Sequence, residues 1–359
     1  MYYPASSLRE SRKGDATMFH FVEIGGGIAK DHLRDLKRYF EVQGIRYETH
    51  AGVIYGDELC KGDCYISCAY VAIDAGPIER ERIFEVQLPH NLTGIKGNNI
   101  GKSKANLNIL GGRRIAICQS LDLSNPRFVV GGYAKWDRIY PERFRVKERR
   151  AELVEERGLD PELPWVCFYP TGPNEYIWGG MDKVFTTLLE VEQKAGPVEF
   201  LVCNHANNNK YRHSRQTVER FIELAGSEEA SADSSLVGGT GKSRMHLVDG
   251  ADGLRHITAC DLFLTDVAST LITALSMKKP IAMLKVKEKE LEYVKLAGLD
   301  RCKRLDDIDD LEAYIAGYEM DEVAKNLFKE CVEYDDDRNC ERITEIIISR
   351  YEDWKKQNH

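Results

Sequence analysis

The sequence lacks any apolar run of membrane-spanning length, and it has no excess of positive charge. No apolar run approaches the roughly 20 residues that a membrane-spanning helix needs. The first 17 residues contain basic side chains but no apolar segment after them. We therefore expect a loose leader over residues 1–17, without a signal peptide or an anchor, on a cytoplasmic protein. The formal net charge of −8 argues against a general nucleic-acid binder.

The sequence also lacks the paired ligand spacing of a zinc finger. Its ten cysteines include the series Cys60-x3-Cys64-x3-Cys68, but no second ligand pair of suitable spacing follows. Most of the other cysteines lie in apolar runs, where reduced and buried cysteines of a cytoplasmic protein are found. From this pattern we predict no metal site.

No internal repeat or low-complexity tract is present, and the chain is long enough for two domains. Hydrophobic residues make up 43% of the chain and charged residues 30%, as in soluble globular proteins. A highly charged stretch, residues 138–157, and the proline-punctuated residues 161–164 predict a boundary between the domains. The predicted domains are residues 18–150 and 160–320, with helices in residues 321–359 that pack back on the first. The predicted strands include residues 18–24, 63–70, 82–87, 114–118, 127–130, 165–169 and 198–203.

Residues 257–284 predict one strand–helix–strand unit with a polar loop. Leu262–Leu264 is an apolar run of the kind that a covered parallel strand shows, and Asp266 lies in the loop after it. Ser269 and Thr270 come at the amino end of the predicted helix. Their hydroxyls and the free backbone N–H groups there suit a phosphate. An ordinary capped helix of an α/β domain explains the same residues.

Two histidines follow predicted strands, one in each predicted domain. His90 comes after residues 82–87, in a loop punctuated by glycine and proline, and His205 follows residues 198–203. Parallel α/β sheets bind ligands beyond the carboxyl ends of their strands, and imidazole titrates near neutrality. His90 is therefore a candidate general base, although a loop histidine bonded to the backbone explains it equally well. The pair predicts a cleft between the domains.

Three consecutive glycines, Gly25, Gly26 and Gly27, predict a tight turn between the first strand and a helix. Such a turn lets the backbone approach a ligand closely. It is not a dinucleotide fingerprint, because Lys30 stands where the third glycine of that motif belongs. Close packing of the strand on the helix explains the same glycines, and a loop on the acceptor side is the other interpretation. Lys96, in the loop after His90, faces either an anionic ligand or solvent.

Taken together, these pieces resemble the CDP-glycerol glycerophosphotransferase family, whose members build chains of polyol phosphate like those of teichoic acids. In the first predicted domain, the family's His-Gly-x-Pro-x-Lys loop resembles His90 to Lys96, and its Gly-Tyr-Pro-x-x-Asp element resembles Gly132 to Asp137. In the second, its Ala-Pro-Thr-Trp-Arg element resembles Tyr169 to Pro173, and its second His-Pro element resembles His205-Ala206. Its Thr-Asp-Tyr-Ser-Ser signature resembles Thr265 to Ser269. The order agrees over residues 87–345. Departures include the glycine after His90 and the tyrosine of the signature, which are both replaced.

The resemblance implies an α/β protein of the GT-B class, in which two Rossmann-like domains face a central cleft. It implies a transferase that moves a glycerol-phosphate-like or glycosyl group from a nucleotide-diphospho donor, most simply a CDP-linked one, to a hydroxyl acceptor. The acceptor would be a polyol phosphate, a glycan or a lipid-linked chain in cell-surface polymer synthesis. No cofactor and no metal are implied, because the helix after Asp266 can offset charge on the leaving nucleotide.

The resemblance also divides the candidate residues between the two substrates. His90 and His205 are the expected catalytic residues. The expected donor and phosphate contacts are Thr171, His205, Asp266, Ser269 and Thr270. The acceptor side comprises Gly25, Gly26, Gly27 and Lys96.

Two other functional classes stay open. A non-hydrolysing sugar-nucleotide 2-epimerase also needs strand-end histidines and a diphosphate-binding helix. A non-catalytic member of the family would only bind nucleotide or polymer. Basic residues at 143–150 leave open a peripheral contact with anionic lipid at the inner face of the membrane, while a solvated helix face is the commoner explanation of such a run.

Overall fold

The computed structural model describes residues 18–24, 27–68, 72–93, 100–169, 188, 197–204, 244–249, 252–266, 270–284, 286–288, 291–305, 310, 313–315, 317 and 322–358. The chain divides into two compact units. Unit 1 comprises Met1–Asp137 and Glu333–His359, and unit 2 comprises Arg138–Val332. Among the described residues, no helix combines the length and apolar character needed to cross a membrane.

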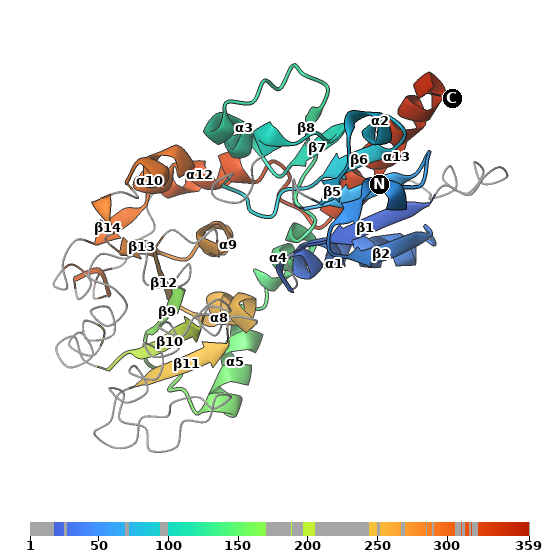
Figure 1. Ribbon diagram of the computed structural model, residues 1–359. Helices are drawn as coiled ribbons and strands as arrows, with labels where there is room; N and C mark the ends of the chain where they lie inside the picture. The colour runs from blue at the N-terminus through green and yellow to red at the C-terminus, as the bar shows by residue number, and fades with distance from the viewer. Residues whose placement is uncertain are drawn as a thin grey trace. The chain divides into compact units, whose positions relative to one another are not determined.

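Unit 1 is built on a six-stranded parallel sheet (Figure 1). In spatial order its strands are β2 (Tyr47–Ala51), β1 (Phe19–Glu23), β4 (Cys64–Ser67), β6 (Phe84–Gln87), β7 (Leu107–Leu110) and β8 (Phe128–Val130). A small second sheet pairs β3 (Ile54–Tyr55) with β5 (Ile73–Asp74). The helices are α1 (Gly27–Val42), η1 (Gly56–Glu58), α2 (Pro77–Arg80), η2 (Ile100–Lys102), α3 (Arg113–Gln119) and α13 (Asn339–Asn358).

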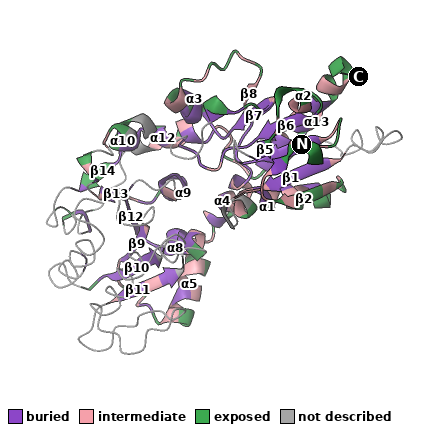
Figure 2. Ribbon diagram, viewed as in Figure 1, coloured by how far each residue is buried: buried purple, intermediate pink, exposed green. Residues whose placement is uncertain are grey.

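The two faces of the unit 1 sheet are covered by different parts of the chain. Alternation along β1 sends Phe19 and Phe21 to one face, where they share a core with α1 and α13. Leu33, Leu36 and Phe40 recur at helical spacing on α1 and are fully buried there. On the other face, Val22 and Tyr65 pack with the β3 and β5 residues Ile54 and Ile73. Figure 2 shows the strands of this sheet mostly in the buried colour.

The amino end of α13 is fixed to the segment that follows β8. The Asp137 carboxylate accepts the backbone N–H groups of Asn339 and Cys340, at 2.7 and 2.8 Å. Asn339 Oδ1 in turn accepts the backbone N–H of Tyr133 at 3.2 Å. Two of the donors that a helix leaves unsatisfied at its start are thereby paired with a carboxylate. The segment from Gly132 to Asp137 therefore holds the last helix on unit 1.

Unit 2 is built on a second six-stranded parallel sheet. In spatial order its strands are β11 (Met245–Asp249), β10 (Glu199–Asn204), β9 (Trp165–Tyr169), β12 (Leu262–Thr265), β13 (Ile281–Leu284) and β14 (Lys303–Leu305). The helices are α5 (Val146–Arg157), α8 (Gly253–Ala259), α9 (Thr270–Ser276), α10 (Leu291–Ala297), η6 (Leu299–Arg301) and α12 (Glu322–Cys331), and α4 (Trp136–Glu142) spans the boundary. The core includes Val166, Phe168, Phe200 and Leu264 from three adjacent strands.

The predicted strand at residues 114–118 is wrong, because these residues lie in helix α3. Ile115 and Ala116 are buried on this helix, which packs on β7. A short continuous apolar run fits either a strand or a buried helix, so its pattern does not distinguish the two. The helix ends at Ser120, whose φ of 51° is left-handed.

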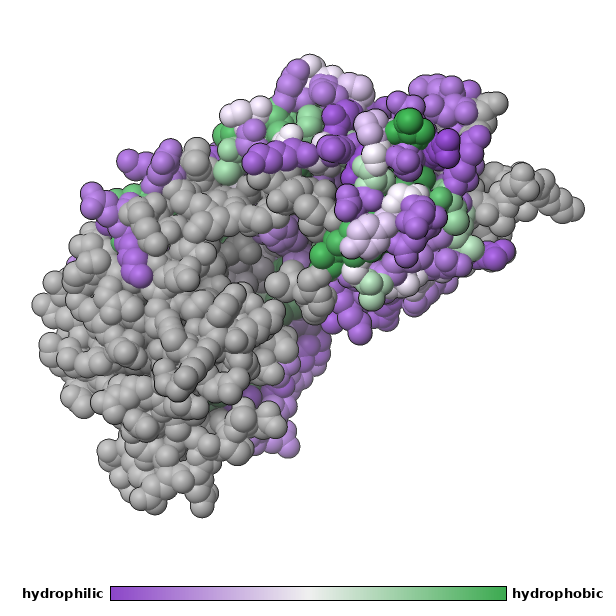
Figure 3. Space-filling view, in the orientation of Figure 1, coloured by the Kyte–Doolittle hydropathy of each residue, from purple (hydrophilic) through white to green (hydrophobic). Residues whose placement is uncertain are grey.

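On the face of unit 1 shown in Figure 3 the described surface is predominantly hydrophilic, with hydrophobic residues in scattered positions. Scattered apolar side chains are normal on a soluble protein surface. This face of unit 1 therefore offers polar and charged chemistry more than an apolar docking surface.

Candidate functional site

His90 lies just beyond the carboxyl end of β6, which ends at Gln87. The chain stays beside β4 as it leaves the sheet, because Leu88 donates its backbone N–H to Ser67 O at 2.7 Å. The His90 ring is half-buried, and its Nε2 lies 3.3 Å from Nδ2 of Asn91. The carboxyl ends of parallel strands are where α/β sheets hold their ligands. His90 is therefore placed where a reacting group would be bound.

Tyr133 links the His90 turn to helix α1. Its hydroxyl donates to the carbonyl oxygen of His90 at 3.3 Å and lies 3.0 Å from Nδ1 of His32. A phenol has one proton, so with that proton on the carbonyl the His32 ring donates its Nδ1–H to the phenol oxygen. The rings of His32 and His90 have centroids 6.2 Å apart. The arrangement fixes the backbone of the His90 turn and leaves Nε2 of His32 as an acceptor.

Burial keeps the groups around this turn neutral. The pKa of His32 is lowered to about 3, first by burial and then by the Lys135 cation. Burial also raises the pKa of Tyr133 well above its usual range. Lys135 itself forms an ion pair with Asp31, with Nζ 2.7 Å from Oδ2. At neutral pH the cluster is thus an uncharged imidazole and phenol beside one ion pair, which suits positioning of His90 more than proton transfer by His32 itself.

Asp35, also on α1, should give unit 1 a measurable pH dependence. Burial raises its pKa from 3.8 to about 6. Because the folded-state pKa is the higher one, the stability that Asp35 contributes is present below pH 3.8 and is lost as the pH rises through about 6. Urea unfolding at pH 4.5 and 7.5 measures the free energy of unfolding of the wild type and of Asp35→Asn. Relative to the wild type, the free energy of unfolding of the variant should be about 1–3 kcal/mol higher at pH 7.5 than at pH 4.5. An equal difference at both pH values would contradict the assignment.

Gln87 brings a buried amide to the end of the same strand. Its side chain is 1% exposed, and neither Oε1 nor Nε2 has a hydrogen-bond partner among the described residues. A buried polar group without a partner costs about 1–3 kcal/mol. Native proteins tolerate this cost chiefly where the group has a further role. The amide is thus a third polar group near the carboxyl end of β6, after His90 and Asn91.

In unit 2 the corresponding position is the carboxyl end of β12. The strand ends at Thr265, whose Oγ1 donates to Tyr169 O at 2.7 Å. Asp266 follows and is fully buried. Thr270 is the first residue of α9, and its Oγ1 is buried without a hydrogen-bond partner in the part of the chain that the structure describes. Asp266 and Thr270 therefore stand at the strand end where a parallel sheet holds ligands.

The other candidate site residues lie outside the described residues, apart from Gly27, which is the first residue of α1. Those outside are Gly25, Gly26, Lys96, Thr171, His205 and Ser269. Their roles stay predictions.

The arginines among residues 143–150 have partners within unit 2. Glu142 accepts Arg145 Nη1 and Arg149 Nη2, both at 2.7 Å. Arg150 Nη1 lies 2.8 Å from Asp261 Oδ2. The guanidinium of Arg150 also covers the Trp165 ring, with Cζ 4.1 Å from the ring centroid. These pairs account for much of the basic run inside the fold. A contact with anionic lipid stays a prediction.

Sequence reasoning missed the part that α1 contributes. Asp31, His32 and Asp35 are polar residues close to the start of a helix whose apolar stripe is otherwise regular. Their position one turn beyond the glycines was the available signal, because that end of the helix lies at the carboxyl end of β1. Side chains with metal-ligand chemistry gather elsewhere in unit 1: among the described residues they are His20, Glu48 and His50.

No protein-family model matches the sequence, and no curated protein matches it. Solved structures do match in fold. The wall teichoic acid polymerase TagF, in a histidine-to-asparagine variant with CDPG, is 12% identical with a TM-score of 0.55 over 96% of this chain and 90% of that chain. A putative UDP-N-acetylglucosamine 2-epimerase from Listeria monocytogenes is 13% identical with a TM-score of 0.58 over 95% of this chain and 98% of that chain.

A third match is the UDP-GlcNAc 2-epimerase from Neisseria meningitidis bound to UDP-GlcNAc. It is 10% identical with a TM-score of 0.55, over 93% of this chain and all of that chain (100%). At such identities the likeness concerns the fold alone. The predicted α/β fold of the GT-B class is confirmed. The structure adds that each of its two main parallel sheets has six strands among the described residues.

Proposed function

We propose that this protein is a GT-B enzyme that transfers a glycerol-phosphate-like or glycosyl group from a nucleotide-diphospho donor to a hydroxyl acceptor. The observation that carries the proposal is the position of His90, in a turn fixed by Tyr133 at the carboxyl end of β6. Support comes from the solved structures of similar fold, which include TagF with CDPG and the Neisseria meningitidis 2-epimerase with UDP-GlcNAc. A CDP-linked donor and a role in cell-surface polymer synthesis, at the inner face of the membrane, complete the proposal.

In this reaction His90 takes the proton of the acceptor hydroxyl while the oxygen of that hydroxyl attacks the donor. For transfer of glycerol phosphate, the new bond is to phosphorus and CMP leaves. For transfer of a sugar, the new bond is to the anomeric carbon and the nucleoside diphosphate leaves. The nucleotide donor would be bound in unit 2 by Asp266 and Thr270, together with Thr171, His205 and Ser269, which lie outside the described residues. The glycine turn and Lys96 would contact the acceptor.

A 2-epimerase is the second candidate, because the matching structures include 2-epimerases with TM-scores as high as those of TagF. Product analysis separates the two, since an epimerase converts a nucleotide sugar without any acceptor. A member that binds nucleotide without turnover is the third.

A thermal-shift screen of CDP-, UDP- and GDP-linked compounds identifies the donor, because a ligand of the native state raises the melting temperature. Acceptor-dependent release of nucleotide then tests the transfer, and its absence with every bound donor would contradict it.

Thr270 gives a test of the donor side. Thr270→Ala should weaken binding of the nucleotide donor about 10- to 100-fold, because it removes a hydroxyl available for hydrogen bonding to a charged phosphate. Thr270→Ser keeps the hydroxyl and should bind nearly as the wild type does. Isothermal titration with the donor found in the screen measures both, and Ser269→Ala should act in the same direction. If Thr270→Ala and Ser269→Ala both bind the donor as tightly as the wild type does, the loop after β12 is not the phosphate site.

A further inference from the structure

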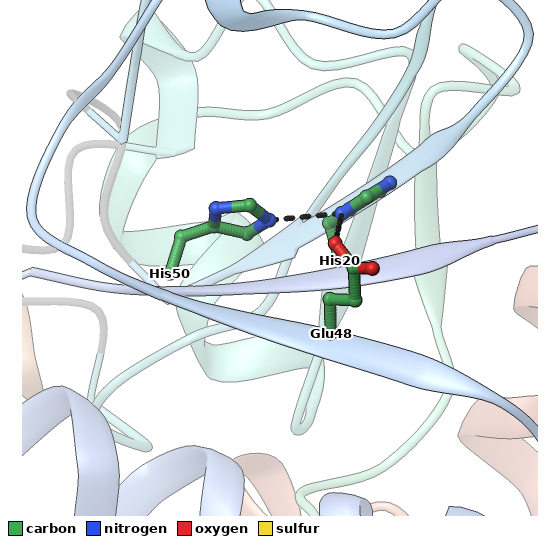
Figure 4. Close-up of side chains that lie close together, drawn as sticks. All are labelled: His20, Glu48 and His50. Carbon is green, nitrogen blue, oxygen red and sulfur yellow. Dashed lines mark hydrogen bonds and ion pairs between the residues drawn. The ribbon is translucent and has the colours of Figure 1, made fainter.

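Strands β1 and β2 place two histidines and a glutamate on one face of the unit 1 sheet. The strands pair in parallel, with His20 opposite Glu48 and Val22 opposite His50. Opposed residues of neighbouring strands point to the same face, as do residues two apart along one strand. His20, Glu48 and His50 therefore share a face. Figure 4 shows the three side chains turned toward one another, with dashed lines joining His20 to the other two.

The donor atoms of these side chains are close enough to bind one ion. His20 Nδ1 lies 2.9 Å from His50 Nε2 and 3.7 Å from Glu48 Oε2. One ligand atom from each of the three lies within 4.8 Å of the others. Two nitrogens bound to a tetrahedral zinc ion at about 2.0–2.1 Å are about 3.3 Å apart. The two rings therefore need to separate by only about half an ångström to admit zinc.

Asp63 fixes the orientation and the tautomer of the central ring. Its Oδ2 lies 2.9 Å from His20 Nε2, so this nitrogen carries the proton. Stacking on Tyr65, with ring centroids 4.5 Å apart and planes at 13°, holds the ring in place. Nδ1 of His20 then carries a lone pair that is directed at His50 and Glu48. Metal-binding histidines are usually supported in this way, by a carboxylate on the second ring nitrogen.

The cluster is anchored on one side and open on the other. The His20 side chain is 4% exposed, whereas that of Glu48 is 57% exposed. β2 is the last strand on its side of the described sheet. An ion bound here would thus have room for a solvent ligand beside Glu48. His50 needs only to place its proton on Nδ1 in order to offer Nε2.

We propose that His20, Glu48 and His50 bind one divalent transition-metal ion of the zinc class, with solvent as the fourth ligand. Two imidazoles and one carboxylate are a ligand set that zinc uses in proteins. His20 lies near the start of β1, whereas His90 follows the carboxyl end of β6. None of the three ligands is among the residues proposed for the transfer reaction, so the ion has a structural role. It joins edge strand β2 to β1 and stabilises unit 1.

The test is a zinc titration of the full-length chain after treatment with a chelator. The wild type should bind one equivalent, and its melting temperature should rise with zinc concentration. Glu48→Gln and His50→Gln should each weaken zinc binding by more than about 100-fold, and Asp63→Asn, which keeps every ligand, by about 10- to 100-fold. Glu81→Gln changes an exposed carboxylate of the same unit and should have no effect. Circular dichroism checks that each variant is folded.

The chain also has ten cysteines, whose thiolates would compete for zinc if they became accessible, and Co²⁺ separates the two kinds of site. Thiolate ligands give Co²⁺ a strong near-ultraviolet charge-transfer band, whereas nitrogen and oxygen ligands give only weak visible bands. We expect the weak visible spectrum, lost in Glu48→Gln and His50→Gln. The proposal is overturned if the wild type binds no equivalent of zinc, if these two variants bind it with unchanged affinity, or if the Co²⁺ spectrum is that of thiolate ligands. None of these outcomes depends on transferase activity.

Discussion

Replacement of His90 with alanine is expected to lower turnover about 10²–10⁴-fold while the dissociation constant of the nucleotide donor stays nearly unchanged. The reason is that an attacking hydroxyl must lose its proton as the new bond forms, and the half-buried His90 ring is the group proposed to take it. The donor contacts proposed in unit 2 do not involve this ring. Initial rates with saturating donor and acceptor measure the first effect, and titration calorimetry with the donor measures the second.

The comparison variant is His205→Ala, which should damage both donor binding and turnover. Tyr133→Phe is a further control, because it keeps the His90 ring but removes the hydrogen bond to its carbonyl oxygen. It should retain most donor affinity and lose less activity than His90→Ala. An active His90→Ala enzyme whose donor affinity is reduced would reverse the roles given to the two histidines.

Gly132→Ala is expected to destabilise unit 1 by about 3 kcal/mol. Gly132 has a φ of +105°, which a residue with a side chain rarely adopts, and a Cβ there would overlap Oδ1 of Asn339. Relief of the overlap would move Asn339 away from the Tyr133 N–H that it accepts. Because Asn339 is the first residue of α13, the attachment of that helix is weakened as well. Urea unfolding followed by circular dichroism measures the loss.

Gly44→Ala separates backbone strain from the overlap. Gly44 also has a positive φ, of +63°, but a Cβ there meets nothing within 4 Å. This variant should lose only about 1–2 kcal/mol, the cost of a left-handed conformation for a residue with a side chain. Equal losses in the two variants would show that the contact with Asn339 contributes nothing to stability.

The architecture was predictable where strong local signals agree. Leu262–Leu264, a polar loop, an apolar helix and Pro280 predicted a strand–helix–strand unit, and β12, α9 and β13 follow that order. The edge strand β2 gave no such signal. None of its residues is buried, and buried and exposed residues do not alternate along it. Neither the strand period of two nor the helix period of 3.6 residues therefore marks it in the sequence. Edge strands are specified by the neighbour with which they pair, which the sequence does not name.

The same limit explains what was missed at the level of sites. The position of His90 after a strand was predictable because strand, loop and histidine are contiguous in sequence, whereas its catalytic role stays a prediction. His20, Glu48, His50 and Asp63 come from three segments, and only the parallel registers of β1 with β2 and β4 bring them together. The expectation of no metal site rested on cysteine spacing and on the family resemblance, and neither carries information about side chains on neighbouring strands. That expectation stays a prediction, which the zinc titration tests.

The return of α13 to unit 1 sets an order of events during protein synthesis. Residues 138–332 are continuous, so unit 2 has its whole sequence available before the ribosome reaches residue 333. Unit 1 does not, because Ile343, Ile347 and Tyr351 complete the core that Phe19 and Phe40 begin. Until those last residues emerge, the sheet face that α1 and α13 share is covered by α1 alone, and its remaining apolar surface is open to association with other chains. Chaperones that recognise exposed apolar surface should therefore bind nascent chains that stop before residue 339 more strongly than the complete protein.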